Sequence, residues 1–417
     1  MENITKRLQQ QIDHASKVKG QVITPPGEYI IGAIYLKSNV HFVLSEDTIL
    51  YGSQELADYP EIDNRVAGID MKWPSAMINI LDATDVTISG KGKIDGQGEC
   101  WWHTFWGTDG KSGMMAAYAK KGLRWAADYD CKRPRNLLIF QSEHITIKDI
   151  HSVESGFWNT QITYSSHVMI DGMTVANSSG PSTDGIDIDS SENVTIQQTR
   201  VSCNDDSICI KAGRGTEAYM NKTVCRNITI RDCHLGKGSG IAIGSETSGG
   251  IEDISISRIT FQQTGAGFRI KSASNRGGYI RNVAISDLNM VNVQFPFLLQ
   301  TNWYPEYSYP VIPKDYQGNV PVYWKKLQDK DFQDAGPAKV ENIVIENVLA
   351  TGDGSVRSRA FFIEGNKNVP IKNLHFSNVS LQAVEYGKIA GVENISFTEV
   401  LVTALEETCK QNDRYER

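Results

Sequence analysis

One short pattern recurs along the chain and restricts the folds available to it. A polar residue, often Asn, is followed by Val or Ile, a second polar residue and another apolar residue. Clear copies begin at Asp85, His144, His167, Asn193, Asn227, Asp253, Asn282, Asn342 and Asn394, and a degenerate copy begins at Asn368. Most successive copies are about 26 residues apart. Regular spacing of strand-like segments predicts a β-solenoid, whose coils stack to bury their apolar faces.

The residue types within the copies exclude repeats built from helices. Apolar residues alternate every second position, and Val, Ile and Thr are abundant, as expected of strands. Asn before each strand suits a tight turn, because Asn tolerates positive φ. A β-sandwich with irregular strands is the alternative, but sandwiches rarely keep a fixed period. We therefore expect an all-β solenoid of about ten coils.

We expect residues 1–417 to form one domain, with residues 1–20 as a short N-terminal helix or tail. Two wide gaps between copies hold aromatic-rich insertions at about 101–135 and 303–339. Loops of this length are usually functional or disordered, and their aromatic content argues against disorder. Their rings, among them Trp303 and Tyr304, would either bind the apolar faces of sugars or simply cover the flank of the coils.

Composition excludes several function classes. The 417 residues are 40% hydrophobic and carry a net charge of -7, which does not resemble a nucleic-acid-binding footprint. No apolar run is long enough for a transmembrane helix. The N-terminus lacks the apolar segment of a signal peptide, which leaves a cytoplasmic protein or a mature domain behind a new methionine. The seven cysteines show neither metal-like spacing nor a disulfide framework.

Charged residues gather around four strand-like segments centred on Ile188, Ile210, Ile243 and Ile270. Strand side chains alternate between faces, so if these isoleucines point into the core, their neighbours point outward together. The polar residues four positions before, or one position beside, these anchors are Asp184, Asp187, Asp189, Asp206, Lys211, Ser239, Arg269 and Lys271. We expect one patch, with carboxylates at one end and Arg269 and Lys271 at the other.

Clustered carboxyl groups open to solvent suggest acid–base chemistry. Glycoside hydrolysis needs one protonated carboxyl and one ionised carboxylate, and closely held carboxyls separate their pKa values accordingly. A Ca²⁺ site is the competing chemical interpretation, and turn-capping Asp residues are the structural one. The combined set favours catalysis over capping: Asp184, Asp205, Asp206, Arg269 and Lys271.

These motifs resemble those of glycoside hydrolase family 28, the polygalacturonase family, over nearly the whole chain. The similar segments are Ser182-Thr183-Asp184, Asn204-Asp205-Asp206 and Arg269-Ile270-Lys271, supported by residues 92–98, 244–250 and 276–278. The resemblance implies a right-handed parallel β-helix and an inverting glycosidase that needs neither metal nor organic cofactor. It also implies that Asp205 is the general acid, and that Asp184 and Asp206 position and deprotonate water.

The resemblance further implies that Arg269 and Lys271 bind a uronate carboxylate, as two cations suit an acidic sugar. The other expected substrate-binding residues are Ser239, Gln161, Lys211, Trp303 and Tyr304. Two positions depart from the family pattern: Gly238-Ser239-Gly240 replaces Gly-His-Gly, and Gln161 replaces a histidine. The departures favour cleavage of rhamnogalacturonan or decorated pectin over plain endo-polygalacturonase activity.

We expect a secreted or periplasmic monomer that cleaves pectic poly- or oligosaccharides next to galacturonic acid, because polymeric pectin lies outside cells. The bulky insertions favour a blocked cleft and exo action. Two other function classes stay open at this point. One is a Ca²⁺-dependent eliminase similar to pectate lyase, and the other is a non-catalytic carbohydrate-binding β-helix.

Overall fold

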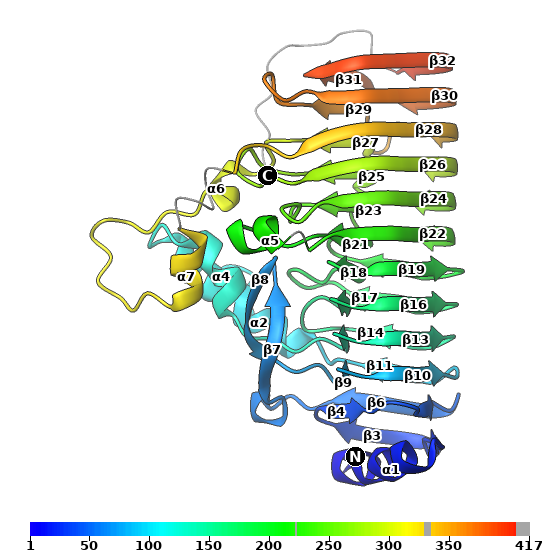
Figure 1. Ribbon diagram of the computed structural model, residues 1–417, viewed down its shortest axis with the longest axis vertical. Coiled ribbons are helices and arrows are strands. Elements are labelled where there is room, and N and C mark those ends of the chain that lie inside the picture. Colours follow the sequence, from blue (N-terminus) through cyan, green and yellow to red (C-terminus); the bar gives the residue numbers. More distant parts are fainter. Residues whose placement is uncertain (222, 329–334, 406–417) are drawn as a thin grey trace.

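The chain folds as a right-handed parallel β-helix, as the repeat and the resemblance predict (Figure 1). The computed structural model describes residues 1–221, 223–328 and 335–405. Within these ranges, every helix is too short or too polar to span a lipid bilayer. The coils stack along the long axis, and their strands pair in parallel with the coils before and after them.

Two parallel sheets form the walls of the solenoid. The smaller sheet supplies the floor of the site, and its 11 described strands are β4 (Ile34–Leu36), β9 (Ile78–Leu81), β12 (Leu137–Phe140), β15 (Thr160–Thr163), β18 (Ile186–Asp189), β21 (Ile208–Lys211), β23 (Ile241–Gly244), β25 (Ala266–Lys271), β27 (Phe295–Gln300), β29 (Arg359–Glu364) and β31 (Glu385–Ala390).

The larger sheet wraps around the rest of the coils. Its 19 described strands are β1 (Glu2–Asn3), β2 (Gln21–Ile23), β3 (Gly27–Ile31), β5 (His41–Val43), β6 (Thr48–Gly52), β10 (Thr84–Ser89), β11 (Lys93–Asp95), β13 (Glu143–Lys148), β14 (His151–Val153), β16 (Ser166–Asp171), β17 (Thr174–Ser178), β19 (Glu192–Gln197), β20 (Arg200–Cys203), β22 (Cys225–Leu235), β24 (Ile251–Gln262), β26 (Tyr279–Val291), β28 (Lys339–Thr351), β30 (Ile371–Ala383) and β32 (Val392–Ala404).

A ladder of buried isoleucines fixes the register of the smaller sheet. Ile188 pairs with Ile210, Ile210 with Ile243, and Ile243 with Ile270, and all four are fully buried. Burying one such side chain contributes about 1.5–3 kcal/mol. A slip of one residue would turn the ladder outward, so the register is strongly specified. The predicted alignment of these four strands is confirmed.

Asparagines occupy a recurring sharp bend near the start of several strands of the larger sheet. Asn193, Asn227, Asn282 and Asn342 all adopt φ between 56° and 59°, as expected of residues that tolerate the left-handed conformation. Their side-chain amides bond from coil to coil; for example, Asn342 Nδ2 donates to Asn282 Oδ1 at 3.2 Å. The turn residues therefore also link neighbouring coils.

The predicted degenerate copy at Asn368 is wrong. Leu374 is the residue that pairs with Ile343 of the coil before. Asn373, with φ of 55°, takes the turn position, and its Nδ2 donates to Asn342 Oδ1 at 2.8 Å. The spacing from Asn342 to Asn373 is longer than the usual period, and the spacing from Asn373 to Asn394 is shorter. The two average to the usual period, so counting by that period placed the copy five residues too early.

A helix closes the N-terminal end of the solenoid. Helix α1 (Thr5–Val18) lies across the first coil (Figure 1). It packs Leu8, Ile12 and Ala15 into the core of the solenoid. These residues are three or four positions apart and so share one face of the helix.

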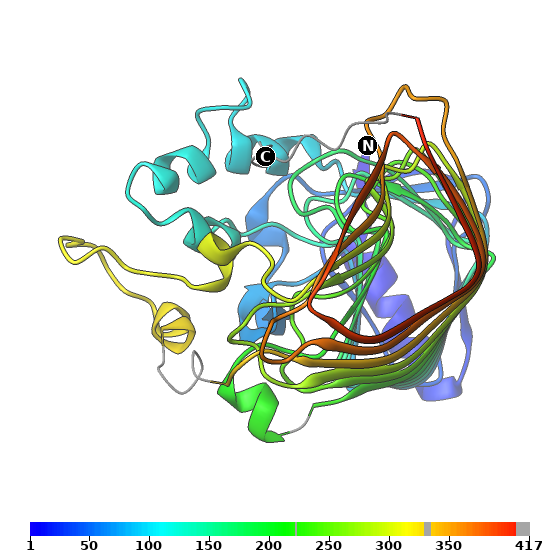
Figure 2. The ribbon, with the colours of Figure 1, turned by 90° about the horizontal axis from the view of Figure 1, so that it is seen from above.

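Three excursions leave the coils on the same side of the solenoid (Figures 1 and 2). The first follows η1 (Leu56–Asp58) and is an antiparallel hairpin of β7 (Glu61–Val66) and β8 (Ile69–Pro74). The second carries α2 (Glu99–Trp106), α3 (Met114–Ala119), η2 (Arg124–Ala126) and α4 (Ala127–Asp130). The third carries α6 (Pro305–Ser308) and α7 (Val322–Leu327); residues 329–334 of its predicted range lie outside the described residues. A short helix, α5 (Thr216–Asn221), lies beside them.

The three excursions share a second apolar core. Trp73 of the hairpin, Trp125 of the second excursion and Trp324 of the third belong to one buried cluster. The rings of Trp125 and Trp324 are 5.3 Å apart. Aromatic residues of both insertions therefore hold the excursions together.

Candidate active site

Parallel stacking brings the three predicted catalytic carboxyls together. Asp184 precedes β18, and Asp205 and Asp206 precede β21. Backbone bonds align these segments, because Gly185 N donates to Asp206 O at 2.9 Å and Ser239 N donates to Asp205 O at 2.8 Å. Carboxylate oxygens of Asp184 and Asp206 lie within 4.8 Å of each other. The site is thus built from the ends of consecutive coils.

Lys211 lies at the centre of the buried charges. It ends β21, and its Nζ is 3.2 Å from Asp187, 3.5 Å from Glu246 and 3.8 Å from Asp184. Its ammonium also lies 4.4 Å from the centre of the Trp158 ring. All four charged side chains are at most 4% exposed. One lysine therefore compensates three carboxyl groups, one of which is a predicted catalytic residue.

Asp206 is held by the two predicted uronate-binding cations. Lys271 Nζ bonds to Asp206 Oδ2, and Arg269 Nη1 is 3.4 Å from Asp206 Oδ1. The prediction that the cations lie at the opposite end of the patch from the carboxylates is therefore wrong. Long basic side chains on β25 cross the intervening strand β23 and reach Asp206, which the spacing of Cα positions does not reveal.

The surroundings shift the pKa values of the three aspartates in different directions. Burial, followed by the charges of Asp187 and Asp205, raises the pKa of Asp184 well above its usual range. Burial and the neighbouring charge of Asp206 raise the pKa of Asp205. Burial opposes the ionisation of Asp206, but Lys271, Arg269 and Lys211 outweigh it and lower the pKa of Asp206. Asp206 is therefore the ionised member, and Asp205 is suited to hold a proton.

A pocket of about 190 Å³ opens over Asp184 and Asp205. The solenoid supplies Trp158, Lys211, Glu246 and Lys271 to its lining, and each excursion adds a wall: Val66 and Ala67, then Arg124 and Asp128, then Trp303, Tyr304 and Tyr307. We call it the catalytic pocket. Three cations and four carboxyl groups line it, and the three excursions wall it on several sides.

A second pocket of about 490 Å³ continues the catalytic pocket toward the C-terminal coils, and Trp303 and Tyr304 line both. We call it the distal pocket. Its floor includes Phe295, Leu298 and Phe362, which pack together. Its polar lining consists of Ser239, Gln294, Gln300, Asn302, Arg269 and Glu364. The distal pocket therefore combines an apolar floor with polar, mainly amide, side chains, one cation and one carboxylate.

The predicted substrate-binding residues fall into three places. Lys211 and Lys271 line the catalytic pocket, and Ser239 and Arg269 line the distal pocket. Gln161 lines neither: it is fully buried, and its amide donates to Arg65 O at 3.1 Å and Thr163 Oγ1 at 2.9 Å. Gln161 therefore supports the hairpin and stays out of reach of the substrate in this structure.

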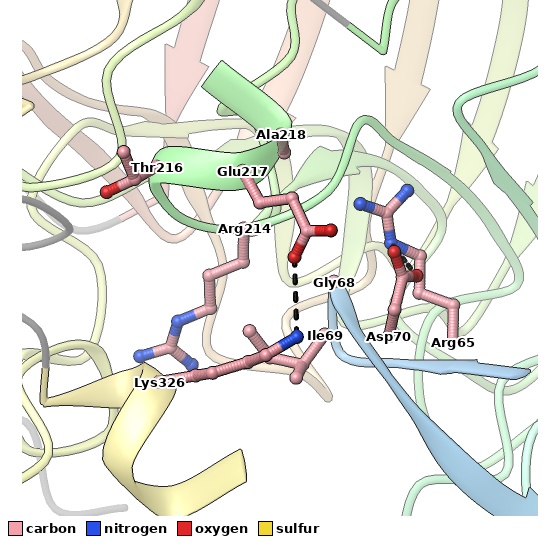
Figure 3. Close-up of a pocket in the computed structure, with 9 residues that line it drawn as sticks. All are labelled: Arg65, Gly68, Ile69, Asp70, Arg214, Thr216, Glu217, Ala218 and Lys326. Atoms are coloured by element: carbon pink, nitrogen blue, oxygen red, sulfur yellow. Dashed lines mark hydrogen bonds and ion pairs between the residues drawn. The ribbon is translucent and has the colours of Figure 1, made fainter. Parts of the chain in front are cut away.

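A third pocket lies behind the tip of the β7–β8 hairpin (Figure 3). Its charged side chains pair with protein groups: Arg65 with Asp70 at 3.4 Å and Lys326 with Glu217 at 3.4 Å. At the tip, Gly68 has φ of 78°, and a Cβ there would lie 2.5 Å from the backbone N of Arg214. This junction fixes the hairpin tip against the segment just before α5, and so positions Val66 and Ala67 in the catalytic pocket.

Sequence reasoning missed the hairpin and several pocket residues. Ala67 and Gly68 both adopt positive φ between two alternating strands, which is the geometry of a tight hairpin. Ala-Gly signals such a turn far less clearly than Asn-Gly. Arg124 and Asp128, paired at 2.6 Å, carried no motif. Glu246 lay within residues 244–250, but its contact with Lys211 requires the fold.

The comparisons with known proteins agree with this architecture. The sequence model described as Glycosyl hydrolases family 28 matches residues 17–310. A probable polygalacturonase of Vitis vinifera is 28% identical over 397 residues, covering 92% of this chain and 72% of that protein. An endo-polygalacturonase of Pectobacterium carotovorum subsp. carotovorum is 28% identical over 319 residues, covering 73% and 70%.

A solved structure of a hyperthermoactive exopolygalacturonase from Thermotoga maritima shares the fold. It has a TM-score of 0.77 at 22% identity, covering 96% of this chain and 88% of that one. The family match extends over well more than half of the chain and includes every motif segment around the catalytic pocket. This protein therefore belongs to glycosyl hydrolases family 28 and is a glycoside hydrolase.

Proposed function

We propose that the protein is an inverting, exo-acting hydrolase that releases galacturonic acid from the ends of pectic chains. One observation carries the proposal: Asp184 and Asp205 share a pocket, walled by the three excursions, with Lys211, Lys271 and Arg124. The carboxyls can act on a glycosidic bond, and the cations suit the carboxylate of a uronic acid. The names of the polygalacturonase relatives support the same substrate. Since polymeric pectin lies outside cells, the proposal includes a secreted or periplasmic location.

In the proposed reaction, Asp205 donates its proton to the leaving oxygen. Its raised pKa favours the protonated form that a general acid needs. Asp184, which faces the same pocket, positions the attacking water, and the neighbouring Asp206, the ionised member of the set, accepts its proton. Water attacks the anomeric carbon directly, so the configuration inverts, as the family resemblance implies. Each step uses side chains of this chain alone.

The exo assignment follows from the walls of the catalytic pocket. An endo-acting site needs a groove open at both ends, so that a polymer can pass through. Here the hairpin tip, η2 with α4, and residues 303–307 all contribute to the pocket lining. On the other side, the distal pocket shares Trp303 and Tyr304 and leads away along the coils. A chain end can enter such a pocket, and the rest of the oligosaccharide can leave through the distal pocket.

Product analysis tests the exo assignment. On long oligogalacturonides we expect galacturonic acid as the earliest product, with substrates shortened by one residue at a time. The measurement is chromatography of time points taken during the first few per cent of hydrolysis. An early ladder of intermediate sizes would contradict exo action. Formation of an unsaturated product that stops when a chelator is added would instead establish an eliminase. Binding without turnover would establish a carbohydrate-binding protein.

The distal pocket extends the proposal to the neighbouring sugar. Arg269, the one cation in its lining, already contacts Asp206. Glu364, the one carboxylate, is paired with Lys388, so the lining offers no uncompensated cation to a second uronate. The apolar floor of Phe295, Leu298 and Phe362 suits the carbon face of a sugar, and the surrounding amides can bond to hydroxyls. We therefore assign a neutral residue, such as a 6-deoxy sugar, to the distal pocket. Galacturonate joined to a neutral sugar is the expected preferred substrate.

Substitution of Glu364 tests this preference. Glu364→Gln should raise kcat/KM on galacturonate–galacturonate disaccharides by about two- to fivefold, because removing a half-exposed charge changes binding by under about 1 kcal/mol. Activity on galacturonate joined to a neutral sugar should stay constant. Glu346→Gln, an exposed control on β28, should change neither value. An equal change on both substrates would contradict the assignment and leave the hydrolase proposal intact.

A further inference from the structure

A pair of stacked histidines interrupts the polar column on the outside of the larger sheet. The column consists of one residue from each of six successive strands, and the residues on either side of it pair in register: Asp85, His144, His167, Asn193, Asn227 and Asp253. All adopt φ between 52° and 58°. Elsewhere along the solenoid, this position is Asn or Asp. At two adjacent coils, those of β13 and β16, it is histidine.

The two imidazoles and one carboxylate converge. The rings of His144 and His167 are 4.8 Å apart at an interplanar angle of 30°. Glu143 Oε1 lies 3.4 Å from His144 Nε2 and 3.4 Å from His167 Nδ1. The latter nitrogen also lies 3.3 Å from Ser166 Oγ. Within the described residues, no Lys or Arg side chain pairs with Glu143, so its charge faces only the two histidines.

These distances match the edges of a metal coordination sphere. Zinc binds imidazole nitrogen and carboxylate oxygen at about 2.0–2.2 Å in a tetrahedral arrangement. Ligand atoms at that radius are about 3.3–3.5 Å apart, which is the separation of Glu143 Oε1 from both nitrogens. All three candidate ligand atoms lie within 4.8 Å of one another. The imidazoles must turn so that a nitrogen of each points at the same ion.

The surroundings can complete the coordination. A shallow pocket surrounds the histidines, and its other lining residues are Asp85, Thr87, Thr146, Val168, Met169, Asn193 and Thr195. The oxygen-bearing side chains among them can hold metal-bound water or orient the imidazoles. Imidazole ligands favour Zn²⁺, Cu²⁺ and Ni²⁺ over Ca²⁺ and Mg²⁺, which prefer oxygen alone.

We propose that Glu143, His144 and His167 form a binding site for a divalent transition-metal ion of the Zn²⁺ type. The ion would join the coils of β13 and β16, in a part of the fold separate from the smaller sheet that carries the catalytic pocket (Figure 1). Its role is to stabilise the solenoid, because a ligand that binds only the folded state raises its stability. Binding requires neutral imidazoles and therefore weakens in acid.

Asparagine substitutions provide a matched test, because Asn already occupies the same backbone position in neighbouring coils. His144→Asn and His167→Asn should fold normally and extend the amide column. Isothermal titration of the full chain with ZnCl₂ at pH 7.5 should show one site in the unmodified protein. Each substitution should weaken that binding by more than about tenfold, since loss of a ligand exceeds the 10–100-fold effect of a second-shell partner. His375→Asn, at a half-buried histidine on β30, is the control and should leave binding unchanged.

Thermal unfolding gives a second readout. Addition of ZnCl₂ should raise Tm of the unmodified protein and of His375→Asn, with no rise in the double variant His144→Asn/His167→Asn. MgCl₂ should have no effect on any of them. Hydrolytic activity should be the same with and without Zn²⁺. If the double variant bound Zn²⁺ as tightly as the unmodified protein, or if Zn²⁺ acted only by inhibiting hydrolysis through the catalytic carboxyls, the proposed site would be wrong.

Discussion

Asp205→Asn is expected to lower kcat by about 10²–10⁴-fold on unactivated oligogalacturonides, the usual contribution of general acid catalysis. The amide has nearly the shape of the carboxyl group but carries no transferable acid proton. Lys211, Lys271 and Arg124 remain in the catalytic pocket, so substrate affinity should change little. Steady-state kinetics and equilibrium binding of a product oligosaccharide measure the two effects separately. Asp253→Asn, the same change at an exposed turn, should retain full activity.

Two further measurements identify the role of Asp205. An aryl galacturonide with a good leaving group needs less proton assistance, so it should partly restore turnover of Asp205→Asn while leaving Asp184→Asn inactive. Burial and the charge of Asp206 raise the pKa of Asp205, and activity of the unmodified enzyme should fall as pH rises through that value. Asp205→Asn should lack this decline. Near-normal turnover of Asp205→Asn on unactivated substrate would assign the proton donor elsewhere.

Lys211→Met is expected to lower the free energy of unfolding by about 3–5 kcal/mol, the usual cost of removing one partner from buried charges. The substitution keeps most of the side-chain volume but leaves Asp184, Asp187 and Glu246 without their shared ammonium group. Urea unfolding measures the loss. Lys237→Met, at an exposed position, should change stability by under about 0.5 kcal/mol.

The pH dependence of this loss distinguishes charge from packing. Without Lys211, the folded-state pKa values of the three carboxyls rise, while those of the unfolded chain stay near 4. Carboxyls with raised folded-state pKa values destabilise the protein only above their unfolded values, so the difference between Lys211→Met and the unmodified protein should shrink as pH falls toward about 4. A loss that stays constant from pH 7 to pH 4 would instead reflect packing of the lysine stem against Trp158.

The solenoid was predictable because its information is local and repeated. Most coils place Ile at the same inward position, so the register of Ile188, Ile210, Ile243 and Ile270 follows from simple alignment. Where one coil is longer and the next shorter, the average period misleads, as it did at Asn368. Which residue takes the turn position in that coil depends on how its strand pairs with the coil before, and that pairing is visible only in the structure.

Only the part of the candidate site that lies on the coils, its floor, was predictable from the sequence. Asp184, Asp205, Asp206, Arg269 and Lys271 stand at fixed offsets from the isoleucine ladder, so their convergence follows from stacking. The walls come from excursions whose positions depend on contacts between distant segments, such as Trp125 against Trp324. Arg124 and Tyr307 reach the catalytic pocket through these contacts, and no periodic pattern marks them. The pairing of Asp206 with both cations depended on side-chain length, which an alignment of backbone positions ignores.

The helix that covers the first coil also limits how the protein can assemble. A stack of parallel coils ends in unpaired backbone groups and an open apolar interior, which can template the addition of another chain. Helix α1 places Leu8, Ile12 and Ala15 over that interior, so another copy of the chain cannot stack its coils onto this end of the solenoid. Growth of fibres by end-to-end stacking is thereby blocked at one end of the molecule, whatever happens at the other.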